Sequence, residues 1–129
     1  MEQKNWAVAR RAVGYTRYDT KENVCIMNDL YEVLRLYVNF FQPSAKLVSK
    51  ERIGPKVVKH YDKHKRPYKR LLEYSCVDEA TKEALRQACE TLNPADLKRR
   101  IDRFKRKLEQ CHKKKNEARK AVDRKSSFV

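Results

Sequence analysis

The sequence predicts a mainly α-helical chain, and three observations lead to this prediction. Glycine and proline are scarce, with two and four copies among 129 residues, which leaves few turns for an all-β fold. Apolar residues recur at spacings of three and four over several long segments, the period of an amphipathic helix. Charged residues make up 38% of the chain and hydrophobic residues 40%, so each helix is expected to expose a broad polar face around a small core.

Apolar spacing predicts a first helix from about Glu2 to Val13. Trp6, Ala9 and Val13 lie three and four residues apart, which places them on one face of a helix. Gly14 follows at the position where glycine commonly closes a helix in the left-handed conformation. The first helix is therefore expected to end there and to lead into a connection.

The second predicted helix covers residues 23–41 and is the most apolar part of the chain. Asp19 or Thr20 can cap its start, and Pro43 stops it. Its apolar stripe is wide enough for a helix that is covered on more than one side. We expect either that later segments fold back over it or that its partner lies outside this chain.

Weaker patterns follow in residues 44–66, which we interpret as a linker or a small hairpin. "KVVKHY" is typical of a short strand and "RIGP" of a turn. Short helices are expected from Pro67 to about Tyr74 and from about Asp78 to Leu92, where small and apolar residues share one side.

A long basic helix is predicted to begin at Asn93-Pro94, a cap residue followed by a proline suited to the first turn. Its apolar positions alternate by four and three, as in the a/d seam of a coiled coil. Lys115 interrupts this seam, whose members are Leu97, Ile101, Phe104, Leu108, Cys111, Lys115, Ala118 and Val122. Residues 98–125 carry 14 basic and four acidic side chains, a formal charge of +10.

The positive charge indicates a polyanionic partner, most simply DNA. The chain holds 32 Lys and Arg against 17 Asp and Glu, a formal net charge of +15, and neutralising phosphates would release counterions. No set of side chains is identified that reads base edges, so the expected binding is non-specific. The candidate DNA-binding residues on the last helix are Lys98, Arg99, Arg103, Lys105, Arg106, Lys113 and Lys114.

Two other interpretations of the basic helix stay open. Its charges can simply solvate the outer face of a helix that packs through its seam. The chain can also act as a stand-alone helical adaptor that associates through the coiled-coil seam, with nucleic acid incidental. No stretch approaches the roughly 20 apolar residues of a spanning helix, and the start has no apolar signal-peptide core, so no membrane partner and a cytoplasmic location are expected.

The cysteine and histidine pattern predicts no metal site and no redox motif. His60 and His64 lie four residues apart without other ligands nearby. The four cysteines contain no close pair, as a zinc or disulfide-exchange motif requires, and are Cys25, Cys76, Cys89 and Cys111.

Several short motifs resemble the end of an integrase-type transposase from a bacterial insertion sequence. The motifs are "EQKNW", then "RRAVGYTRYDT", and then the apolar helix ending in "LYVNFFQPSAKL". The similarity is to the D-D-E enzymes with an RNase H-like catalytic core, and it extends from Glu2 to about Arg100. It implies that residues 1–43 are the last helices of that core, that 44–66 are a linker or hairpin, and that 67–129 are a basic helical C-terminal region.

This resemblance assigns Glu2 to the third catalytic carboxylate. In two-metal phosphoryl transfer, carboxylates hold a pair of Mg²⁺ ions that activate the attacking oxygen and stabilise the leaving one. The two aspartates of the set would come from an upstream sheet, so Mg²⁺, the cofactor of the parent family, is not expected to bind tightly to this chain. A simpler interpretation of Glu2 is a first-turn acid favoured by the helix dipole.

The resemblance also implies DNA contacts near the glutamate, for which Lys4, Arg10 and Arg11 are the nearest basic residues. We expect a truncated DNA strand transferase that is not catalytic alone. Its expected partners are DNA, a full-length transposase or a second copy of itself, and its expected location is the bacterial cytoplasm, on the nucleoid when bound to DNA.

Overall fold

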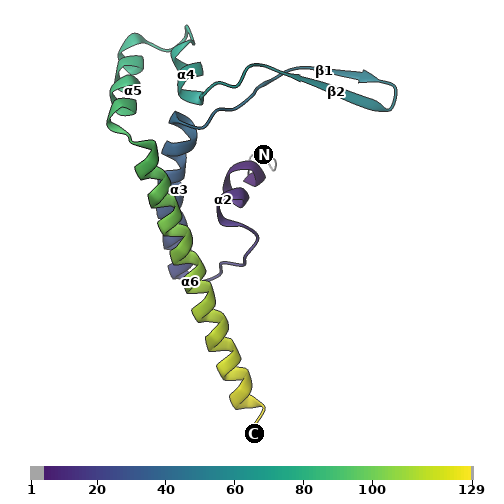
Figure 1. The fold of residues 1–129 in the computed structure, drawn as a ribbon, viewed down its shortest axis with the longest axis vertical. Coiled ribbons are helices and arrows are strands. Elements are labelled where there is room, and N and C mark those ends of the chain that lie inside the picture. The colour runs from purple at the N-terminus through teal and green to yellow at the C-terminus, as the bar shows by residue number, and fades with distance from the viewer. Residues whose placement is uncertain (1–4, 129) are drawn as a thin grey trace. The chain divides into compact units, whose positions relative to one another are not determined.

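A computed structural model describes residues 5–128 of the chain, with side chains from residue 8 onward. The elements are η1 (Asn5–Arg10), α2 (Arg11–Val13), α3 (Lys21–Phe40), β1 (Leu47–Ile53), β2 (Lys56–Tyr61), α4 (Pro67–Leu72), α5 (Glu79–Thr91) and α6 (Pro94–Ser126). Helices dominate and one two-stranded sheet accompanies them (Figure 1), which confirms the prediction of a mainly α chain.

The chain divides into two compact units. Unit 1 comprises Met1–Leu34 and Lys98–Val129, and unit 2 comprises Arg35–Leu97. The predicted boundaries at residues 43 and 66 divide the chain by function instead of by compactness. They stay a prediction.

Unit 1 is built on an antiparallel pair of helices, the first part of α3 and α6. Asp19, just before α3, forms an ion pair with Lys115, and Glu22 in the first turn of α3 lies at the same cleft as Cys111 of α6. A residue further along α3 therefore faces a residue earlier in α6, so the two helices run antiparallel. Figure 1 shows them side by side. Leu30 of α3 and Leu108 of α6 are 0% and 1% exposed. The later segment thus folds back over the apolar helix, one of the two arrangements that its wide stripe predicts.

The helix starts in unit 1 and at the beginning of α6 follow the predicted caps. Thr20 Oγ1 accepts a hydrogen bond of 3.2 Å from the backbone N–H of Asn23. Asn93 Oδ1 accepts from the N–H of Ala95 at 3.0 Å. Both side chains satisfy amide groups that the first turn of a helix leaves without partners.

The predicted first helix takes a different form over its described part. The chain forms a π-helix from Asn5 to Arg10 and then the short α2, so its turns are wider than those of an α-helix. Gly14 follows with φ of 76° and ψ of −160°, a positive-φ conformation that favours glycine but differs from the left-handed helical one predicted there. Glu2 and Lys4 lie outside the described residues.

Unit 2 contains the end of α3, the hairpin of β1 and β2, and helices α4 and α5. Asp62 follows β2 and accepts hydrogen bonds from Arg70 of α4 at 2.5 and 3.0 Å, one to each carboxylate oxygen. The Asp62 carboxylate also accepts from the backbone N–H of Lys46 at 2.6 Å. The base of the hairpin is thereby tied to α4 by a bidentate ion pair, a geometry with strong directional preference.

Candidate nucleic-acid interface

The burial of the seam sets the orientation of α6. Ile101 and Leu108 are 2% and 1% exposed, and Cys111 and Lys115 are half-buried. The seam therefore faces inward within unit 1 as far as Lys115, and the opposite side of α6 faces solvent.

A line of eight residues, six of them basic, lies on that opposite side, and we call it the outer stripe. Its positions step by four and three like the seam, but half a turn away from it. Every member is exposed, and the members are Arg99, Arg103, Arg106, Gln110, Lys113, Glu117, Lys120 and Arg124. At 1.5 Å per residue, the stripe is about 38 Å long.

The six cations of the outer stripe have no carboxylate partner among the residues that the structure describes. Some other basic residues of α6 have partners within the chain. Lys98 lies 3.6 Å from Asp102, and Arg119 lies 4.0 Å from Asp19. The Lys107 ammonium lies 5.4 Å from the centre of the Phe104 ring. Six cations without a carboxylate partner thus share one line of the helix, where an external anion can reach them. Off this line, Arg100, Lys114 and Lys125 are likewise exposed and have no carboxylate partner among the described residues.

The candidate DNA-binding residues fall on and off this line. Four of them belong to the outer stripe, namely Arg99, Arg103, Arg106 and Lys113. Lys98 lies beside the stripe, and Lys105 is half-buried against Ala12, Val13 and Tyr18 in a small pocket. Lys114 lines a cleft between α3 and α6, and Arg10 and Arg11 are exposed near the start of unit 1.

Two cations of the stripe were not among those candidates. Lys120 and Arg124 extend the line about three turns beyond Lys113, and both are exposed. Their signal in the sequence is the same four-three spacing that defines the seam, applied to the basic residues instead of the apolar ones.

The cleft between α3 and α6 lies within unit 1. Its lining includes Glu22, Cys25, Asp29 and Cys111. Burial, followed by the neighbouring Glu22 carboxylate, raises the pKa of the Cys111 thiol, which favours its neutral, less reactive form. Across the described residues, no group of three or more His, Cys, Asp or Glu side chains is placed to hold a metal ion.

None of the described helices is both long enough and apolar enough to span a membrane.

Comparisons with known proteins add one match. No family model matches the chain. Over 61 residues the chain is 54% identical to a protein described as the uncharacterized protein y4rM of Sinorhizobium fredii (strain NBRC 101917 / NGR234). The match covers 47% of this chain but 17% of that protein, so the chain spans less than a fifth of its curated relative. No solved structure matches the chain.

Proposed function

We propose that this chain binds duplex DNA without sequence preference through the outer stripe of α6. The observation that carries the proposal is the line of six exposed cations without internal partners. Duplex DNA presents a dense line of phosphates, and each phosphate that a Lys or Arg neutralises releases counterions. Such contacts position a protein on DNA but do not select a sequence.

We further propose that the chain corresponds to the C-terminal part of a D-D-E transposase. The sequence motifs "EQKNW" and "NFFQPSAKL" support this ancestry, with η1, α2 and α3 in the place of the last helices of an RNase H-like core. Glu2 would then be the third ligand of a Mg²⁺ site that needs two aspartates from another part of the protein. With Mg²⁺ alone, the purified chain is expected neither to nick nor to join DNA, and cleavage that is lost in Glu2→Gln would contradict this.

The test of DNA binding compares two triple variants with the same net charge. The stripe variant replaces Arg99, Arg103 and Arg106 with Gln. The control replaces three basic residues that have internal partners, Lys98, Lys107 and Arg119, with Gln. Affinity for a duplex of random sequence is measured by fluorescence anisotropy between 50 and 200 mM NaCl.

The slope of log K against log[salt] is negative for DNA binding. We expect its magnitude to decrease by about 2.7 in the stripe variant, because each lost phosphate contact removes about 0.9. The control variant is expected to keep most of the wild-type slope. Equal slopes in the two variants would show that only net charge matters and would contradict a contact through the outer stripe.

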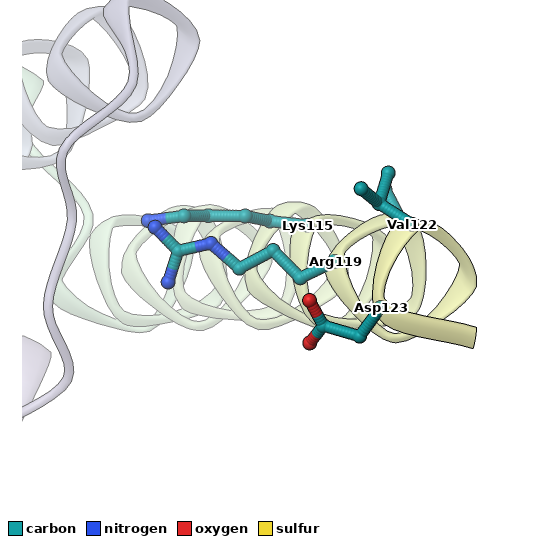
Figure 2. A pocket seen from close by; sticks show the side chains of 5 residues that line it. Lys115, Arg119, Val122 and Asp123 are labelled. Atoms are coloured by element: carbon teal, nitrogen blue, oxygen red, sulfur yellow. The ribbon is translucent and has the colours of Figure 1, made fainter. Parts of the chain in front are cut away.

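One observation favours a second candidate function, self-association through the end of the seam. Val122 is 65% exposed and Ala118 is exposed, although both continue the apolar positions of α6. Figure 2 shows Val122 projecting from the helix beside the longer Arg119 and Lys115 side chains. A second copy could cover these positions as a coiled coil does. Sedimentation equilibrium tests this candidate function by measuring the molecular mass in solution. The wild-type chain should be a dimer, and the double variant Ala118→Lys with Val122→Lys should be a monomer.

A further inference from the structure

The hairpin of unit 2 has two chemically different faces. Its register pairs Lys50 with Lys59 and Arg52 with Val57, and these two pairs share one side of the ribbon because side chains alternate between faces. The pairs of the other side contain Glu51, Lys56 and His60. We call the side with Lys50, Arg52, Val57 and Lys59 the basic face.

The basic face holds like charges directly opposite each other. Residues paired across an antiparallel ladder have Cβ atoms about 5 Å apart, and like charges at such positions destabilise the sheet. Lys50 and Lys59 are both exposed, and no carboxylate among the described residues pairs with either of them. Packing therefore does not account for this pair, whereas an external anion would remove its repulsion.

Neither side of the hairpin packs against the rest of unit 2. Val48 and Ile53 are 69% and 64% exposed, and Lys50, Arg52 and Lys59 are exposed as well. Within unit 2 the ribbon extends away from α4 and α5 (Figure 1). Its tip is a tight loop in which Gly54 has φ of 62°, as the first position of a type II′ turn requires.

The hairpin is nevertheless held at its base. Asp62 and Arg70 join the end of β2 to α4, and Ser44 and Lys65 exchange backbone hydrogen bonds of 3.0 and 3.1 Å. The ribbon is thus a defined arm rather than a free loop.

We propose that the basic face of this hairpin is a second binding site for duplex DNA, separate from the outer stripe of α6. The major groove of B-DNA is about 12 Å wide and admits a two-stranded ribbon, and the cations of the basic face match the charge of its phosphate walls. The inference shares its partner class with the proposed function but depends on different residues.

The experiment compares two double variants of the full chain with equal net charge. The basic-face variant replaces Lys50 and Lys59 with Gln. The control replaces two exposed lysines outside that face with Gln. They are Lys56 on the opposite side and Lys63 in the connection to α4. A charge-preserving variant, Lys50→Arg with Lys59→Arg, shows whether charge rather than lysine itself is needed, and circular dichroism monitors folding of all three.

For the basic-face variant, we expect the magnitude of the salt slope for binding to a random duplex to decrease by about 1.8, since two contacts are lost at about 0.9 each. The control is expected to lose less than half of that, and the arginine variant to bind like the wild type. Equal slopes in the basic-face variant and the control would overturn the inference. It would equally be overturned if the basic-face variant lost binding to anionic phospholipid vesicles but kept its DNA affinity.

The outer-stripe triple variant is measured alongside, because it separates the two proposals. A slope that falls only in the stripe variant leaves the proposed function standing and overturns the hairpin site. A slope whose magnitude decreases only in the basic-face variant supports the hairpin site and overturns binding through the outer stripe. A wild-type chain without salt-dependent DNA binding contradicts both.

Discussion

Asn23 is a fully buried polar residue in the first turn of α3, with an exposed fraction of 0%. Its backbone N–H donates to Thr20, but neither polar atom of its side chain has a hydrogen-bond partner. A buried amide without partners costs stability, whereas an apolar group of similar shape at the same place does not. This residue therefore lowers the stability of unit 1.

We predict that Asn23→Leu raises the free energy of unfolding by about 1 kcal/mol, since it replaces an unsatisfied amide with an apolar side chain of the same branching. Urea denaturation followed by circular dichroism measures the change. Asn28→Leu, at an exposed position of the same helix, is the matched control and should change little. A destabilised Asn23→Leu chain would show that the amide has a partner in solution, such as a bound water.

Asp62 is the residue that ties the hairpin to α4. Its hydrogen bonds from Arg70, and then that from the backbone N–H of Lys46, hold the pKa of the Asp62 carboxyl well below its usual range. Because the folded pKa is depressed, the stabilising contribution is complete above the unfolded value of about 3.9 and is lost as the pH falls through the folded pKa.

Asp62→Asn should therefore lower stability at pH 7 but have progressively less effect as the pH falls below about 4. Thermal unfolding of both proteins at a series of pH values from 7 to 2 measures the difference. A gap between the two proteins that stayed constant over this range would mean that ionised Asp62 contributes nothing that the amide cannot supply.

At the scale of elements, α6 has two different sides, the seam and the outer stripe, which lie half a turn apart. The seam holds the helix against α3, and the outer stripe faces solvent. The seam is covered unevenly, since Leu108 is 1% exposed whereas Val122 is 65% exposed. Truncations to alanine at different positions of this one seam should consequently have very different costs.

Leu108→Ala is predicted to lower the free energy of unfolding by about 2–5 kcal/mol, the range for cavities in packed cores. Val122→Ala, further along the same seam, should cost less than about 0.5 kcal/mol, as is usual for exposed positions. Both values come from urea denaturation at a protein concentration at which the chain is monomeric. Similar costs at the two positions would indicate that Val122 is covered in solution.

The elements that could be predicted from the sequence are those with strong local patterns. The four-three spacing from Leu97 onward predicts the seam, and "KVVKHY" coincides with β2 (Lys56–Tyr61). The partner strand β1 was not predicted individually, because "LVSKERI" has charged residues on both faces and no apolar alternation. Lys115 was predicted only as an interruption of the seam, since its partner Asp19 lies 96 residues away and no local pattern encodes such a contact.

At the scale of the whole molecule, the net charge of +15 sets a common background for every site. Like charges repel more strongly in the compact state than in the expanded one, and salt screens this repulsion. The candidate site itself could be predicted in part, since basic residues on α6 are evident from the sequence. Which of them are free could be predicted only in part. Lys107 contacts Phe104 three residues before it on the same helix, a local contact, whereas the Asp19–Arg119 ion pair depends on how α6 packs.

We predict that raising NaCl from 20 to 200 mM increases the melting temperature by about 2–5 °C, since screening relieves repulsion worth about 1 kcal/mol. Differential scanning calorimetry measures this shift. The stripe triple variant, with three fewer positive charges, should show a smaller increase. A melting temperature that falls with salt would mean that attractive ion pairs such as Asp19–Lys115 outweigh the repulsion.

From Glu117 to Ser126, every residue of α6 is exposed. A helical segment of this length is marginal in water by itself, so its order depends on propagation from the covered turns before it. Two cations of the outer stripe, Lys120 and Arg124, lie on this segment, and an anion that neutralises them would favour its helical state. The length of α6 is then a thermodynamic variable rather than a fixed dimension. Cooling, dilution of salt or a bound polyanion would each change how far the helix extends, and DNA affinity would carry the heat-capacity signature of a helix that grows as it binds.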